Sequence, residues 1–353
     1  MTDETGTGVG VKPAAVDRPA KRAAPARVPW LARLLTAKET GVFLALVCMC
    51  LFLAFATESF LTTTNLLNVG RQISLLGIMA VGMTFVLVAG EIDLSVGSIY
   101  ALSGLATGML VIAGWPLLPA LVLGLMIGAS IGLINGLMST YGRLPSLIAT
   151  LGMLSIVRGT ALLLTDGQPV TVNERNGAHP DVLASFEFMG QGYLFGIVPM
   201  QLVFFILVAA IGWLVLSRTA FGFRVFAVGG SAKAARVSGI HVHSVKIWAF
   251  VIMGMLAALA GILSMAFLPS GQAGRTGLGL ELDVIAAVVV GGASLSGGIG
   301  TIPGTVLGVL IIGVLRNGLV LMGVSPFMQE VMIGLVIIIA VAIDKWSMRS
   351  RAS

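Results

Sequence analysis

The sequence predicts an all-α integral membrane protein with about ten membrane-spanning helices. Hydrophobic residues make up 57% of the 353 residues and charged residues only 10%, whereas a soluble domain carries about 25% charged residues. Apolar stretches close to the roughly 20 residues that a helix needs to cross hydrocarbon recur along the chain. The formal net charge of +6 comes from basic residues that cluster in three segments, as expected for one side of a membrane rather than for a nucleic-acid-binding surface.

The chain is predicted to begin with a disordered basic tail over residues 1–38, which are rich in Ala, Pro, Lys and Arg and lack apolar periodicity. The next run, 41–57, ends in Ala54-Phe55-Ala56, which resembles a signal cleavage site. Because this run is longer than the apolar core of a signal peptide, roughly 7 to 15 residues, we expect a retained span. The membrane domain is placed at 39–345 and a cytoplasmic C-terminal tail at 346–353.

The other expected spans have the same apolar character, and the one at 281–293 is the weakest because it is short. They are 72–90, 94–113, 117–138, 146–165, 194–216, 247–268, 281–293, 303–322 and 327–343. Segment 217–246 contains five basic residues and no acid, so it and both termini are expected in the cytoplasm. Ten spans satisfy this arrangement and place the more acidic loop 166–193 outside.

Two glycine series predict close packing between helices. Four glycines recur at every fourth position, which places them on one helix face where a neighbouring backbone can approach: Gly124, Gly128, Gly132 and Gly136. Gly300, Gly304 and Gly308 repeat the pattern. An echo of Glu-x-Asp, at 91–93 and 281–283, is followed in each case by Leu-Ser-Gly, so two related repeats are a plausible interpretation.

Charged residues near or inside spans are costly and are functional candidates by default. The candidates for the pathway or for a helix break are Glu91, Asp93, Ser95, Arg158, Glu281 and Asp283. Asp93 is expected to cap the helix that follows it, by accepting amide protons. An alternative role for these acids is to accept hydrogen bonds from a passing substrate. Arg316 and Glu330 flank one turn and are expected to pair there.

Catalytic chemistry has little support in the sequence. The three histidines fall in predicted loops and form no metal-ligand cluster, so no metal is expected. The glycine-rich run 291–304 lacks the Gly-Lys-Ser/Thr of a phosphate-binding loop and is expected to be a helix break or a tight turn between the eighth and ninth spans. Three classes remain: a proton-coupled carrier that titrates Glu91 or Asp93, a channel, and a permease driven by a separate ATPase.

The basic segment 217–246 favours the permease. Residues 232–237 are predicted to form a short Ala-rich helix that Gly239 ends. A helix of this length is unstable by itself and needs a partner surface.

Four stretches of this chain resemble the permease subunits of bacterial ATP-binding-cassette importers for simple sugars, such as ribose, xylose and arabinose. They are GEIDLSVGSIYALSG at 90–104, PSLIATLGMLSIVRGTALLLTDGQPV at 145–170, FGFRVFAVGGSAKAARVSGI at 221–240 and the run from 281 to 319. The resemblance covers about 41–345 and leaves the basic tail outside.

The resemblance implies a non-catalytic subunit that pairs with a second permease copy in the bacterial inner membrane. It also implies two cytoplasmic ATPases, which bind ATP and Mg, and an extracytoplasmic sugar-binding protein; this chain itself would hold no cofactor. The ATPase-coupling positions that it implies are Gly229, Gly230, Ala234, Ala235, Arg236, Ser238 and Gly239. Ser231 and Lys233 depart from the usual family residues, which are Asn and an acidic residue respectively.

Overall fold

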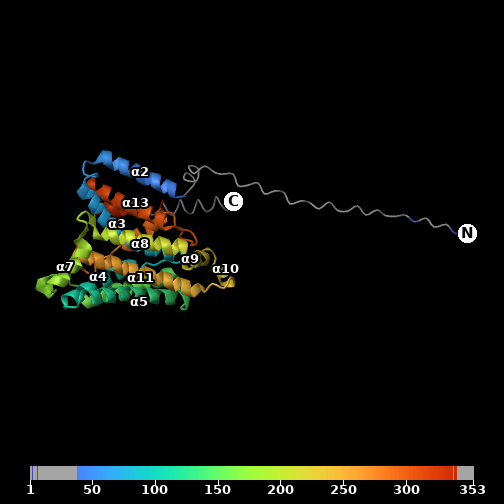
Figure 1. The fold of residues 1–353 in the computed structure, drawn as a ribbon, viewed down its shortest axis with the longest axis horizontal. Coiled ribbons are helices and arrows are strands. Elements are labelled where there is room, and N and C mark those ends of the chain that lie inside the picture. The colour runs from blue at the N-terminus through green and yellow to red at the C-terminus, as the bar shows by residue number, and fades with distance from the viewer. Residues whose placement is uncertain (1, 3–5, 7–37, 337, 340–353) are drawn as a thin grey trace. The chain divides into compact units, whose positions relative to one another are not determined.

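The computed structural model describes residues 2, 6, 38–336, 338 and 339, and these residues are mostly helical (Figure 1). The all-α prediction is therefore confirmed. Each of the ten predicted spans overlaps a helix in the described residues. Most of the predicted basic tail, the end of the last predicted span and the tail at 346–353 lie outside them.

Among the described residues, six helices are long and apolar enough to cross a bilayer. They are α3 (Thr63–Val88), α5 (Leu117–Thr140), α6 (Ser146–Thr165), α8 (Met200–Arg218), α11 (Val242–Phe267) and α13 (Ile302–Leu321). Shorter apolar helices are α2 (Lys38–Ala56), α4 (Val96–Ile112), α9 (Ala220–Gly230) and the helix Pro326–Val336. The weak predicted span at 281–293 contains α12 (Leu280–Val290), which has only 11 residues.

The structure adds elements that the apolar pattern did not predict. Helix α9 occupies part of the expected loop 217–246, ahead of the predicted short helix, which is present as α10 (Ala232–Val237). Loop 166–193 contains the 3-10 turn η1 (Glu174–Asn176) and helix α7 (Pro180–Gln191). Two small antiparallel pairings join β1 (Val170–Thr171) to β4 (Ser270–Gly271) and β2 (Tyr193–Leu194) to β3 (Val198–Pro199).

Helix α11 lies at the centre of the described bundle, and it packs most extensively against α5, α4 and α3. In Figure 1 it runs between α8 and α5, while α2 lies at the other side of the bundle against α13. Helix α3 is the most buried of the six long helices, whereas fewer than a third of the residues in the apolar parts of α5, α6 and α8 are buried. In a membrane their exposed surface is covered by lipid or by another subunit.

The predicted glycine seam is present between α5 and α11. A Cβ atom added to Gly128 would lie 2.2 Å from the carbonyl oxygen of Gly254, and one on Gly132 would lie 2.3 Å from that of Phe250. The backbones of the two helices are thus in contact without side chains between them. The second series acts similarly, because a Cβ on Gly308 of α13 would lie 1.9 Å from the carbonyl oxygen of Ala287 in α12.

The echoed motifs do not occupy matching positions in the fold. Residues 91–93 lie in a non-helical segment, whereas 281–283 form the first turn of α12. The Leu-Ser-Gly at 102–104 lies inside α4, and that at 295–297 lies in the turn after α12. The echo is therefore a similarity of sequence without equivalent local structure.

The seam predicts that Gly128→Leu lowers the yield of folded protein. The new side chain would meet backbone that cannot rotate away, and overpacking of this kind costs about 1 to 3 kcal/mol. Gly152→Leu on α6 is the matched control, because a Cβ there meets nothing within 4 Å. Size-exclusion profiles of both variants test this. Equal monodisperse yields would show that the α5–α11 contact does not limit folding.

Candidate functional site

A non-helical segment separates α3 from α4. Helix α3 ends at Val88, Gly90 has φ 80°, and α4 does not start until Val96. A φ of this sign is unstrained only for glycine, so Gly90 turns the chain out of the helix. The amide of Glu91 still donates to the carbonyl of Val86 in α3, and the carbonyl of Ser95 accepts from Ile99 in α4. The backbone groups between them lie outside any helical ladder, and such groups are expensive to leave unpaired in a membrane.

The first turns of α6 supply hydrogen bonds to this segment. The amide of Ile92 donates to Ser146 Oγ at 3.3 Å, and the amide of Leu94 donates to Thr150 Oγ1 at 3.1 Å. Both acceptors are hydroxyl groups, and they lie one helical turn apart on α6. The distance between them therefore matches the distance between alternate residues of an extended chain, such as Ile92 and Leu94. The segment is thus held in shape by side chains of a neighbouring helix.

Asp93 is buried and stabilises the turn into α4. Its Oδ1 accepts hydrogen bonds from the amide of Ser95 at 2.8 Å and from Ser95 Oγ at 2.6 Å. Asn135 of α5 donates to Ser95 Oγ at 2.8 Å, and all three residues are fully buried. The expectation that Asp93 caps α4 was wrong in position: Ser95 is the N-cap residue, without a side-chain cap bond, and Asp93 acts two residues before it.

Glu91 pairs with Lys246, which lies in the second turn of α11. Both side chains are largely buried, with 10% and 20% of their surfaces exposed. The pair places Glu91 at the same end of the bundle as segment 217–246, as the predicted topology requires. Lys246 neutralises the charge of Glu91. Glu91 therefore links its segment to α11 and is not a free carboxylate.

Three backbone segments meet next to Gly90, and we refer to Gly90, Gly229 and Gly297–Gly298 as the glycine junction. The amide of Gly298 donates to the carbonyl of Val88 at 2.9 Å. A Cβ on Gly229 would lie 1.7 Å from that same carbonyl oxygen. The junction therefore joins the end of α3, the end of α9 and the turn between α12 and α13 by direct backbone contact.

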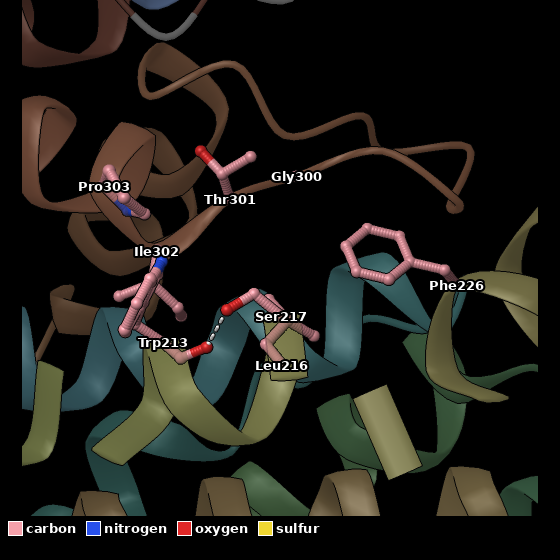
Figure 2. Close-up of a pocket in the computed structure, with 8 residues that line it drawn as sticks. All are labelled: Trp213, Leu216, Ser217, Phe226, Gly300, Thr301, Ile302 and Pro303. Carbon is pink, nitrogen blue, oxygen red and sulfur yellow. Dashed lines mark hydrogen bonds between the residues drawn. The ribbon is translucent and has the colours of Figure 1, made fainter. Parts of the chain in front are cut away.

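A pocket of about 210 Å³ lies close to the junction, between α8, α9 and the start of α13. Figure 2 shows Phe226 of α9 and Trp213 of α8 on either side of it, with residues 300–303 opposite. The chain is thus less tightly packed between α9 and α13 than at the glycine junction. Gly229 therefore provides a close backbone contact between α9 and α3.

Helix α10 follows the junction directly. Ser231 caps it by accepting a hydrogen bond from the amide of Ala234 at 3.2 Å, and Gly239, with φ 82°, follows its C-cap Ser238. Ala235 is only 4% exposed, so its methyl group packs within this chain, whereas Val237 is 85% exposed. The outer face of α10 is formed by Lys233, Ala234, Arg236, Val237 and Ser238.

Val237 was not among the residues predicted for coupling. The sequence shows an apolar residue directly after Arg236 at the end of the short helix, but its exposure depends on how α10 packs.

The remaining candidates form a second group, away from residues 91–95 in sequence. Arg158 of α6 donates to the backbone carbonyls of Ala273, at 2.8 Å, and Thr276. The carboxylate of Glu281 lies against Gly97, and its buried Oε2 has no hydrogen-bond partner among the described residues. Arg158 therefore fixes the loop that leads into α12, whereas Glu281 retains an unused acceptor.

Asp283 and Arg316 form an ion pair at 2.8 Å. The expected contact of Arg316 with Glu330 is present but longer, at 3.8 Å. Arg316 thus bridges α12, its own helix α13 and the helix after it. The sequence did not indicate that Asp283 would be the closer partner.

These features define a polytopic membrane protein with a broken helix, a buried polar cluster and a capped helix at one end. The family model described as "Branched-chain amino acid transport system / permease component" matches residues 65–341. The chain belongs to this family of permease components. It is a multi-pass membrane protein and a transport subunit rather than a catalytic enzyme.

Curated relatives cover most of the chain. A ribose import permease protein of Bacillus subtilis is 44% identical over 308 residues, 87% of this chain and 93% of that protein. The ribose import permease protein of Escherichia coli K12 is 40% identical over 307 residues, with the same coverage. An L-arabinose ABC transporter permease protein of Azospirillum brasilense is 35% identical over 316 residues, 89% of each chain. None of the solved structures matches the chain.

The glycine junction predicts different effects for two adjacent glycines. Gly229→Ala would place a methyl group against the Val88 carbonyl and force α9 away from α3, whereas a Cβ on Gly230 meets nothing within 4 Å. We expect Gly229→Ala to lower transport at least about tenfold at normal membrane abundance, the factor that about 1.4 kcal/mol represents. Gly230→Ala should transport normally. Uptake per unit of membrane protein tests this, and equal rates would contradict the role of the junction.

The Glu91–Lys246 pair predicts a non-additive effect on stability. Glu91→Gln or Lys246→Met alone leaves a largely buried charge without its partner, which typically costs about 3 to 5 kcal/mol. The double variant removes both charges and should be more stable than either single variant. Thermal unfolding of the purified protein measures this, with exposed Asp181→Asn as the control. If the penalties of the single variants simply add, the pair does not hold the segment.

Proposed function

We propose that the chain is the membrane-spanning subunit of an ATP-binding-cassette importer that moves a simple sugar, specifically a monosaccharide, into the cytoplasm. The observation that carries the proposal is the similarity over about nine-tenths of each chain to import permeases named for ribose and arabinose. Relatives named as ABC transporter permeases support an ATP-driven system. The proton-coupled alternative has no support among these relatives, and Glu91 forms an ion pair with Lys246.

The proposal includes the partners that such a subunit requires. A second permease copy would complete the pathway, two cytoplasmic ATPases would bind ATP and Mg, and an extracytoplasmic binding protein would deliver the sugar. This chain would carry no cofactor itself. Its basic segment 217–246 supports the assignment of α10 and both termini to the cytoplasmic side of the bacterial inner membrane.

The geometry supports a route from the ATPase to the pathway. The outer face of α10 would seat in the ATPase, and a displacement of α10 would move the end of α9. Gly229 contacts the Val88 carbonyl, so the movement would reach the end of α3 and residues 91–95. Ser146, Thr150, Asn135 and Lys246 hold that segment to three other helices, and it would therefore move them together.

Reconstitution tests the proposal. Vesicles that contain this chain, its ATPase and its binding protein should take up ribose or arabinose only when ATP is supplied, and an uncoupler should leave the rate unchanged. Uptake that persists without the ATPase and collapses with the uncoupler would instead establish a proton-coupled carrier. Failure with both pentoses but ATP-dependent uptake of another sugar would correct the substrate alone.

Docking of the ATPase predicts a specific effect at Val237. Val237→Glu adds a charge to an exposed apolar side chain, so the fold of this chain should survive while ATPase seating is lost. Ala235→Glu is a poorer probe, because Ala235 is buried within this chain. Ile197→Glu, at an exposed apolar position between β2 and β3, is the matched control. ATPase co-purification should fall about tenfold or more for Val237→Glu alone. Full co-purification of Val237→Glu would exclude this face of α10 from the docking surface.

A further inference from the structure

A polar cavity of about 570 Å³ lies beside α10, between α9 and the first turns of α11. Arg224 of α9 lies on one side of it and Ser244 of α11 on the other. Ser238 and His241, from the connection between α10 and α11, complete its polar lining. The cavity is thus rich in hydrogen-bond donors, and one of them carries a permanent positive charge.

The charge of this cavity is not balanced by the chain. Residues 217–246 contain five basic residues and no acid. Glu91, the acid that lies against this end of α11, forms an ion pair with Lys246. In the part of the chain that the structure describes, no carboxylate forms an ion pair with Arg224. The cavity therefore suits an anion supplied from outside the chain.

An apolar groove lies next to the cavity. Trp248 lines both the cavity and a groove of about 230 Å³ between α5 and α11. Met126, Leu133 and Val251 line this groove. Ser244, Trp248 and Val251 follow one another on one face of α11 at helical spacing, so the surface changes from polar to apolar along about 10 Å. Trp248 is 56% exposed, as is common for tryptophan at a membrane interface.

We propose that this cavity and groove bind one anionic phospholipid, with its phosphate headgroup at Arg224 and His241 and an acyl chain along α5 and α11. A polar, cationic cavity and an apolar groove that share Trp248 match the two halves of such a lipid. A soluble anion would leave the groove without a partner. A protein segment would have to be both acidic and lipid-exposed.

The position of the site gives the lipid a way to act on α10, the helix that is proposed above to dock on the ATPase. The lipid headgroup would lie beside Ser238, the C-cap residue of α10, and beside Gly239, which follows it. Occupancy would therefore stabilise the connection between α10 and α11. Transport would then respond to the anionic lipid content of the membrane.

Lipid retention tests this proposal with the full chain. Protein reconstituted in mixed vesicles of phosphatidylglycerol and phosphatidylcholine is extracted, and the retained lipids are quantified by mass spectrometry. The unmodified chain should retain phosphatidylglycerol in preference to phosphatidylcholine. Arg224→Gln should lower that preference about fivefold, the change expected from one basic residue near a bilayer surface. Arg224→Lys should keep most of it, and Ser130→Phe, which fills the groove, should lower it.

Arg218→Gln is the matched control, because Arg218 lies at the end of α8 over the ring of Trp213 and outside the cavity. Equal retention by Arg224→Gln and the unmodified chain would overturn the proposal, as would an equal loss for Arg218→Gln. Displacement of the lipid by inorganic phosphate would show a site for free anions instead. Displacement by the added ATPase would assign the cavity to that partner. Size-exclusion profiles of every variant establish that the fold is intact.

Discussion

The direct contact between the backbones of α5 and α11 is the constraint on which the rest of the site depends. Gly128 and Gly254 each approach the carbonyl of the other, which fixes the two helices at a distance that no larger residue permits. Asn135 lies on α5 and Lys246 lies on α11, near the same end of the seam. The seam thus sets the separation of two side chains that hold residues 91–95 from different helices.

The non-helical segment is stable because polar side chains replace the hydrogen bonds that a helix would have made. A backbone group left unpaired in a bilayer costs several kcal/mol, on the order of an ordinary buried polar group in hydrocarbon. Ser146 and Thr150 accept from the amides of Ile92 and Leu94, and Asp93 accepts from the amide of Ser95. Asp93 therefore has a structural role in this apolar chain, because its carboxylate satisfies donors that the break in the helix exposes.

Much of this fold could be predicted from the sequence, because a bilayer imposes a simple length and polarity rule on helices. The glycine seam could be predicted too, since a four-residue repeat marks one face of a helix. Helix α9 could not, because its 11 residues are too few to cross the membrane and its basic surroundings resemble a loop. Similarly, the short strands β1 and β2 and their partners have no periodic pattern that could identify them.

The site was predictable by residue type but not by geometry. Glu91 and Asp93 were recognisable as unusual acids, yet no sequence pattern indicated that Lys246, more than 150 positions away, would neutralise one of them. The exposure of Val237 and the burial of Ala235 depend on how a six-residue helix rotates against its neighbours. Residue identity indicates which side chains are costly, whereas tertiary packing decides which partners remove that cost.

The two ends of the segment 91–95 differ in how they are held, and this difference bears on transport. At Gly90 the contacts are between backbones without side chains, so a small displacement of Gly229 meets the Val88 carbonyl at once. At Asp93 and Ser95 the contacts are hydrogen bonds between buried side chains, which favour one geometry and resist gradual distortion. In the proposed importer, the stiff contact at the α9 end and the directional cluster at the α4 end would turn a small movement of α9 into a defined shift of α4.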